Sequence, residues 1–187
     1  MADNSLDRFI AEARGGWGPL GSSLVQRCRA GLAALTLADP REDWLAALLA
    51  ERPASRELHR DAVHGFVLLA HAEPGGLYRP PHDHGRSWVV YGVQSGTLEV
   101  VTYAKVPDVP DDERGDERLV ARDSAVLRPG EARAYLPGDV HDTRCLGDGA
   151  LLFRFTERDL GHEDRVERRM TRYCERDGEW RAPARTP

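Results

Sequence analysis

Three histidines in this sequence have the spacing and setting of a shared metal site. His82 and His84 lie two residues apart in a segment rich in strand-forming residues, 75–96. Side chains at positions i and i+2 of a β-strand point to the same face, so the two imidazoles are expected to converge. His141 follows a Pro-Gly turn in LPGDVHDTR, at the start of another expected strand. Three neutral imidazoles that meet inside β-structure predict a site for a divalent transition metal.

The composition is typical of one soluble globular domain. The chain has 187 residues, of which 41% are hydrophobic and 30% charged, and its net charge of -5 provides no basic surface for nucleic acid. No apolar run reaches the length of a membrane span, and the start, MADNSLDRF, lacks the regions of a secretory signal. Three widely spaced cysteines, Cys28, Cys145 and Cys174, indicate reduced thiols. We therefore expect a cytoplasmic protein that binds neither nucleic acid nor membranes.

The N-terminal part, residues 1–53, has the periodicity of three helices. Apolar residues recur at helical spacing in SLDRFIAEAR, with Asn4 or Ser5 available as the cap. A second helix is expected from about residue 22 to Leu35. A third is predicted to begin with Asp39 as its cap and Pro40 at its first position. These helices are expected to pack on the outside of a sheet and to carry no chemistry.

The period changes from helical to extended in residues 56–157. Short runs rich in Val, Leu, Tyr and Phe alternate with Gly, Pro and Asp clusters, which is typical of an all-β sandwich or barrel. The acidic segment 104–119 is predicted to be a solvated loop, since Pro107 and Pro110 are unsuited to a central strand. The charged tail, 161–187, is expected to form one short helix at most, anchored by Val166, Met170 and Tyr173.

The histidine motifs resemble those of a known superfamily. HDHGRSWVVYGVQSG, followed by PGDVH with His141, is similar to the cupins and, within them, to the cysteine dioxygenase-like proteins. The resemblance covers residues 56–157 and implies a mainly β double-stranded β-helix, or jelly roll, with the metal in the barrel mouth. Many cupins have a glutamate ligand four or five residues after the second histidine, where this chain has Trp88 and Val89. The resemblance therefore favours the three-histidine site of thiol dioxygenases.

The resemblance implies a non-haem Fe(II)-dependent dioxygenase with His82, His84 and His141 as ligands. Its partners would be dioxygen and a small thiol or related molecule other than cysteine. Imidazole also binds zinc, nickel, copper and manganese, so the ligand type leaves the metal open. The alternative is a metal-binding cupin without oxygenase activity, either a small-molecule sensor or an isomerase or hydrolase. The chain would be a monomer or a homodimer.

Two catalytic candidates follow from comparison with the family and from strand alternation. The arginine that holds the substrate carboxylate in cysteine dioxygenases corresponds by spacing to Arg56, with Arg60 as a competitor and a surface role as the alternative. Tyr91 is expected to point into the cavity and donate to a bound substrate, the alternative being a core aromatic. The family has a serine, a histidine and a tyrosine where this chain would place an apolar wall of Leu151, Phe153 and Phe155.

Several neighbouring residues are expected to support the site or to be structural. Asp83 and Asp142 flank the histidines and could accept their imidazole N–H groups. Cys145 could be a fourth ligand, although a buried apolar role is the preferred interpretation. His71 is interpreted as a structural histidine on its strand.

Overall fold

The computed structural model describes residues 4–107 and 117–183. Three helices come first: α1 (Ser5–Gly15), α2 (Ser22–Thr36) and α3 (Asp43–Glu51). Nine strands and one helix follow: β1 (Arg56–Arg60), β2 (Val67–Pro74), β3 (Tyr78–His82), β4 (Val89–Pro107), β5 (Glu117–Leu127), β6 (Ala132–Tyr135), β7 (Val140–Thr156), α4 (Leu160–Arg165), β8 (Cys174–Arg176) and β9 (Glu179–Arg181). Among the described residues, no helix combines the length and apolar character needed to cross a bilayer.

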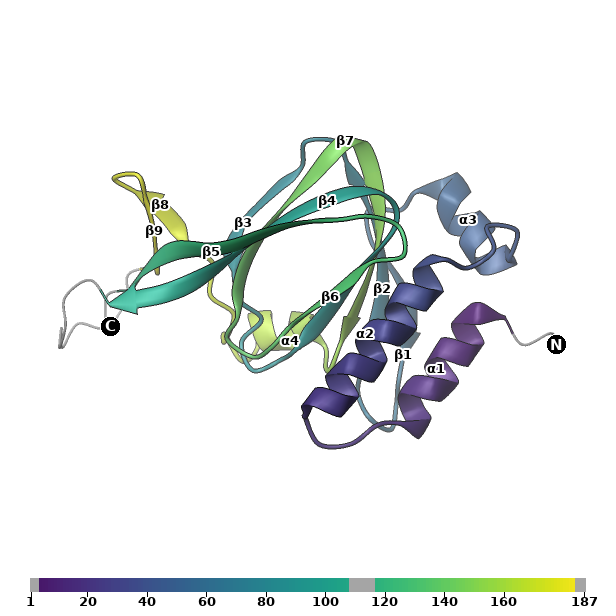
Figure 1. The fold of residues 1–187 in the computed structure, drawn as a ribbon. Coiled ribbons are helices and arrows are strands. Elements are labelled where there is room, and N and C mark those ends of the chain that lie inside the picture. The colour runs from purple at the N-terminus through teal and green to yellow at the C-terminus, as the bar shows by residue number, and fades with distance from the viewer. Residues whose placement is uncertain (1–3, 108–116, 184–187) are drawn as a thin grey trace.

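Two long antiparallel strands, β4 and β7, form the centre of a curled sheet (Figure 1). The early part of β4 pairs with β6 and its later part with β5, while β3 and β2 pair with the two halves of β7. The β4–β7 register shifts around Ser95. Such bulges bend strands and increase their twist, which lets each long strand pass from one side of the barrel to the other.

A glycine makes one of these bends possible. Gly96 has a φ of 80°, and a Cβ atom there would lie 2.2 Å from the Gly149 carbonyl oxygen. The bend of β4 therefore approaches the backbone of β7 more closely than any side chain would allow.

The predicted class, a mainly β jelly roll with N-terminal helices on its outside, is confirmed.

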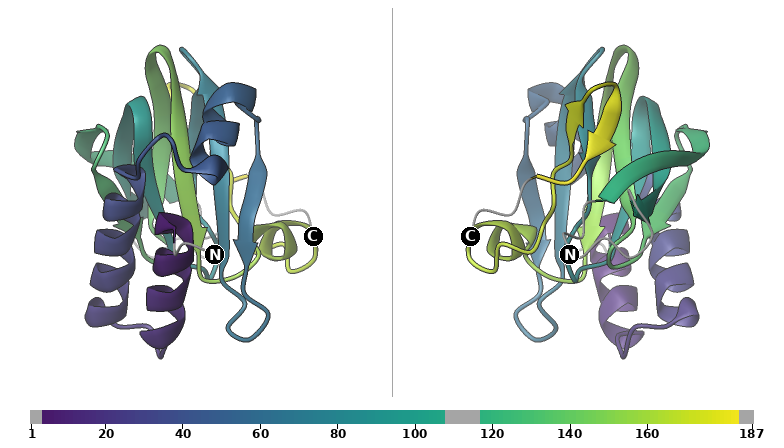
Figure 2. Two further views of the ribbon diagram at one scale, coloured as in Figure 1. Left: turned by 90° about the vertical axis from the view of Figure 1, so that its right-hand side faces the viewer. Right: turned by 90° about the vertical axis from the view of Figure 1, so that its left-hand side faces the viewer.

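The sheet separates two apolar cores. One lies between the sheet and the helices and contains Leu32, Leu45, Trp88 and Phe153, all at most 1% exposed. The other lies inside the barrel, around Val93 and its neighbours. Figure 2 shows α1 and α2 packed side by side against one face of the sheet. The helices thus cover the outer face of the strands and leave the barrel interior to other residues.

The helix starts agree with the sequence at one place and differ at another. Asn4 caps α1, because its side-chain oxygen accepts a hydrogen bond from the Asp7 backbone N–H at 2.8 Å. The predicted start of the third helix at Asp39 and Pro40 is wrong. Asp39 instead accepts a hydrogen bond from the Arg41 backbone N–H at 2.9 Å and closes a turn, and α3 begins at Asp43. Aspartate favours both arrangements, so the cap pattern alone does not separate them.

The described parts of the acidic segment and of the tail are more ordered than the sequence predicted. Residues 104–107 belong to β4 and residues 117–119 to β5, whereas Pro110 lies outside the described residues. After β7 the chain forms α4, which contains none of the three expected anchors, Val166, Met170 and Tyr173. Val166 is 66% exposed, while Tyr173 is only 3% exposed. The segment after the barrel is therefore a packed part of the fold.

Candidate metal centre

The three histidines come together inside the barrel. One ring nitrogen from each of His82, His84 and His141 lies within 4.8 Å of the others. Their ring centroids form a nearly equilateral triangle with sides of 5.2, 4.9 and 5.0 Å. Within the part of the chain that the structure describes, no carboxylate or thiol joins this group, so Cys145 is not a member.

The convergence of His82 and His84 has a different cause from the one predicted. Strand β3 ends at His82, and His84 lies two residues beyond it in the connection to β4. Strand alternation therefore does not orient His84. Asp83, between them, accepts hydrogen bonds from the Gly85 N–H at 3.1 Å and the Thr171 N–H at 2.9 Å. These bonds fold the connection back so that His84 faces its neighbours.

His141 is held from two sides. It is the second residue of β7, just after the turn at Gly138, and its backbone lies opposite His82 of β3. Its ring stacks on Tyr135 of β6, with the centroids 3.9 Å apart and the planes at 28°. The predicted Pro-Gly turn and strand start are thus present, and the aromatic contact fixes the orientation of the imidazole.

The hydrogen bonds of the rings indicate which nitrogen of His82 can be a ligand. Its Nδ1 lies 2.9 Å from the Pro80 carbonyl oxygen. A carbonyl can only accept, so Nδ1 carries the proton and Nε2 keeps a free lone pair. The expected roles of Asp83 and Asp142 are wrong: neither accepts from these imidazoles. Asp142 accepts from the Tyr78 and Tyr103 hydroxyls at 2.9 and 2.6 Å.

The remaining ring nitrogens fit a metal site. His84 Nδ1 and both nitrogens of His141 are buried without a hydrogen-bond partner among the described residues. Burial, followed by the charge of a neighbouring histidine, lowers the pKa of His84 and of His141 well below the usual value. Burial also lowers the pKa of His82. The three rings are therefore neutral at neutral pH, with unused lone pairs, as metal ligands must be.

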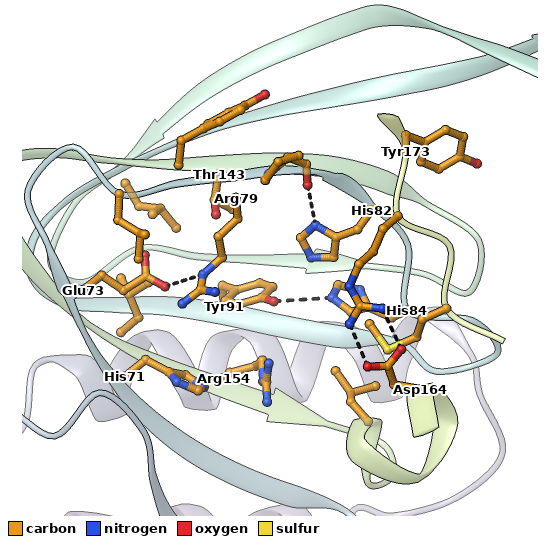
Figure 3. A pocket seen from close by; sticks show the side chains of 18 of the residues that line it. His71, Glu73, Arg79, His82, His84, Tyr91, Thr143, Arg154, Asp164 and Tyr173 are labelled. Atoms are coloured by element: carbon orange, nitrogen blue, oxygen red, sulfur yellow. Dashed lines mark hydrogen bonds and ion pairs between the residues drawn. The ribbon is translucent and has the colours of Figure 1, made fainter. Parts of the chain in front are cut away.

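A cavity of about 500 Å³ opens beside the histidines (Figure 3). Tyr91 lines it, with its hydroxyl 3.4 Å from His84 Nε2. The side chain is 9% exposed, and burial raises the pKa of Tyr91, so the phenol stays protonated at neutral pH. Strand alternation along β4 correctly predicted that Tyr91 faces the cavity; its catalytic role stays a prediction.

The expected apolar wall on β7 is wrong by one residue. Leu151, Phe153 and Phe155 point away from the cavity and pack in the helix-facing core. Leu152 and Arg154 line the cavity in their place. A shift of one residue along a strand exchanges its two faces. These three residues therefore do not line the cavity in which a substrate would bind.

Arg56 lies outside the cavity, contrary to the prediction from family spacing. It pairs with Ala70 across β1 and β2, and Ala70 belongs to the helix-facing core. Its guanidinium forms an ion pair with Glu51 of α3. The competitor Arg60 pairs with Glu57 and Asp159 and does not line the cavity either.

Sequence reasoning missed much of the cavity. His71 lines it from β2, together with Glu73, which pairs with Arg79 of β3 at 2.8 Å. The C-terminal segment contributes Met170, Arg172 and Tyr173. Alternation along β2 could have identified His71 and Glu73, two residues apart on one face. For the C-terminal segment, the isolated apolar Met170 and Tyr173 in a charged stretch were the available signal.

The chain matches no protein-family model and no curated protein. Among solved structures it is similar to KdgF from a Halomonas species, at 17% identity and a TM-score of 0.41, covering 55% of this chain and 74% of that one. It is similar to the cupin domain of Cnp3 from Schizosaccharomyces pombe, at 12% identity and a TM-score of 0.43, covering 59% and 64%. It is also similar to a protein from Neisseria meningitidis, at 22% identity and a TM-score of 0.41, covering 62% of this chain and 93% of that one. These likenesses are too distant to assign a function.

Proposed function

We propose that this protein is a metal-binding cupin that acts as a non-haem Fe(II)-dependent dioxygenase on a small thiol. The observation that carries the proposal is the group of three neutral imidazoles, with ring nitrogens within 4.8 Å of one another and no carboxylate among them. Neutral ligands leave the full positive charge on a divalent ion and fill only part of its coordination sphere. A bound Fe(II) would supply the redox chemistry and lower the pKa of the substrate thiol.

The residues around the histidines would orient the substrate and manage its protons. Tyr91 holds a proton at its hydroxyl, 3.4 Å from His84, where it can donate a hydrogen bond to a substrate bound beside the imidazoles. Leu152 and Leu98 line the same cavity and limit the access of water. The family resemblance implied a serine, a histidine and a tyrosine on β7, which this chain lacks. Tyr91, Arg154 and His71 supply polar groups in the cavity instead.

The test is metal analysis of protein from its native host, followed by oxygen uptake with a panel of small thiols. Stoichiometric iron and thiol-dependent uptake support the proposal. The Tyr91→Phe variant should keep its metal and lose about tenfold or more of the uptake rate, because it lacks only the hydroxyl. Zinc or another metal without uptake would refute the dioxygenase and favour the sensor, isomerase or hydrolase alternative. Absence of any metal would refute both.

A further inference from the structure

Two side chains of β2 line the cavity with acceptor atoms that have no partner. His71 and Glu73 lie two residues apart, on one face of the strand. Within the described chain, His71 Nε2 and Glu73 Oε2 are buried and make no hydrogen bond. The Glu73 residue as a whole is only 5% exposed. A buried polar atom without a partner is costly, which indicates that a bound molecule pairs with these two atoms.

The neighbouring contacts identify both atoms as hydrogen-bond acceptors. His71 Nδ1 lies 3.2 Å from the Ala54 carbonyl oxygen, so Nδ1 carries the ring proton and Nε2 keeps its lone pair. Burial lowers the pKa of His71 to about 4, so the ring is neutral at neutral pH. Glu73 Oε1 accepts a hydrogen bond from Arg79 Nε at 2.8 Å, which leaves Oε2 as the second acceptor. The pair therefore needs two donor hydrogens from a ligand.

The charges around the pair favour an uncharged donor. The Glu73 carboxylate already has Arg79 as its counter-ion, and Arg154 lies beside His71 with no carboxylate partner among the described residues. An ammonium bound there would share one carboxylate and face two guanidiniums. Among neutral groups, a hydroxyl donates one hydrogen, whereas the NH2 group of a primary carboxamide donates two from a single nitrogen.

The spacing along β2 suits a carboxamide. Positions two apart on a strand are separated by about 6.7 Å at the backbone. An NH2 nitrogen with two hydrogen bonds of about 2.9 Å bridges acceptors about 5 Å apart, so the two side chains need to lean toward each other by less than about 2 Å. Figure 3 shows His71 and Glu73 at the opposite end of the cavity from His82 and His84, with Tyr91 between them. One small molecule can therefore extend from the imidazoles to β2.

We propose that His71 and Glu73 bind the carboxamide NH2 group of a small thiol whose sulfur is directed at the three histidines. This inference rests on the proposed function, since it names the substrate class of the same site. It assigns substrate recognition to β2, where His71 was expected to be structural.

The test uses cobalt-loaded protein, in which thiolate binding is followed by its charge-transfer absorption. The thiols 2-mercaptoacetamide and 3-mercaptopropionamide are compared with methyl mercaptoacetate and methyl 3-mercaptopropionate, esters that keep the carbonyl group and lack the N–H donors. The wild type should bind the amide of at least one length about tenfold or more tightly than its ester. Equal affinity at both lengths, or tighter binding of the hydroxyl thiol 3-mercapto-1-propanol than of either amide, overturns the inference.

Variants of β2 show whether the preference originates there. Glu73→Gln can keep an oxygen toward Arg79 and then places an NH2 group, which cannot accept, at the position of Oε2. His71→Leu removes the other acceptor. Each variant should reduce the amide preference about threefold or more, and the double variant should abolish it. The affinity for the esters should stay within about twofold, because they donate to neither atom.

Two matched controls alter the same residue types elsewhere. Asp164→Asn changes a cavity carboxylate that Arg172 holds with two hydrogen bonds of 2.7 Å, and His64→Leu changes an exposed histidine. Both should keep the amide preference within about twofold. A preference that persists in the double variant overturns the inference while cobalt binding upholds the metal site. Failure of the wild type to bind cobalt or any thiol overturns the proposed function as well. The wild-type comparison of amide and ester keeps the test decisive if a variant does not fold.

Discussion

The two faces of β7 between Ala150 and Thr156 differ in what they contribute. On one face, Leu151, Phe153 and Phe155 pack against the helices, and Phe155 meets Phe9 of α1 edge to face at 5.6 Å between ring centroids. On the other face, Leu152 and Arg154 line the cavity. Alternate residues of one strand thus pack the core or line the cavity beside the candidate metal site. The helix-facing side packs the core, while the cavity side includes a charged residue.

The largest expected effect is on stability, through the helix-facing side. Phe153 is fully buried and packs against Trp44, with ring centroids 5.6 Å apart. Phe153→Ala should lower the free energy of unfolding by about 3–5 kcal/mol, because it leaves an enclosed cavity. Leu152→Ala on the opposite face should cost less, about 2 kcal/mol, since the gap merges with an existing cavity. Urea unfolding measures both, and equal losses would contradict the distinction between the faces.

The next effect concerns the cavity side at the other end of β7. His141→Ala should weaken metal binding by about 100-fold or more, since removing even a group that hydrogen-bonds to a ligand costs about 10–100-fold. The substitution also removes a buried ring that stacks on Tyr135, so it should lower the unfolding free energy of the metal-free protein, and urea unfolding must show that the variant is folded before affinities are compared. Isothermal titration with Co(II) measures the affinity. His64→Ala, at an exposed histidine, is the control; unchanged metal affinity in His141→Ala would refute the site.

Acidification should affect the cavity side selectively. Burial lowers the pKa values of His71, His84 and His141 in the folded protein, so the unfolded chain takes up protons first as the pH falls. The metal-free protein should be fully stable above about pH 6.5 and lose up to about 1.4 kcal/mol per pH unit for each histidine below it. For His71 the loss ends near its folded-state pKa of about 4. Urea unfolding at several pH values tests this, and His71→Leu should reduce the slope.

The smallest effect is expected at Arg56. Its side chain pairs with Glu51 on the surface and does not reach the cavity. Arg56→Gln should therefore leave metal content and the affinity for carboxylate thiols unchanged, because a surface ion pair contributes little. The same cobalt titration serves as the measurement. A loss of metal or thiol affinity in Arg56→Gln would restore the assignment taken from family spacing.

The sequence predicted what depends on residue type and local period. The helical repeat identified the three N-terminal helices, and the three histidines chosen as candidate ligands are the ones that the structure brings together. The faces of β7 were not predictable in this way. Counting in twos from His141, through Thr143 and Cys145, assigns Phe153 to the interior. The irregular stretch between Leu146 and Ala150, which contains Gly147 and Gly149, reverses the alternation, and Ala150 and Leu152 turn inward instead.

The pairing of distant segments could not be predicted from the sequence either. Arg56 turned outward because β1 aligns it with Ala70, and no local pattern specifies that register. Arg154 has no carboxylate partner among the described residues, because Glu73 pairs with Arg79 and Asp164 pairs with Arg172. The sequence does not specify which arginine each carboxylate contacts.

The order of synthesis gives one feature of the site a further meaning. Residues 171–173 hold the end of β3: the Asp83 N–H donates to the Thr171 carbonyl at 3.0 Å, and the Tyr173 N–H donates to the Pro81 carbonyl at 2.9 Å. His82 lies between these two contacts. The ribosome makes residues 171–173 well after His82, so the first ligand stays loosely held until this later segment has emerged and packed against β3. Ion capture is then expected to follow that packing, and a chain truncated before Thr171 should bind its cation weakly.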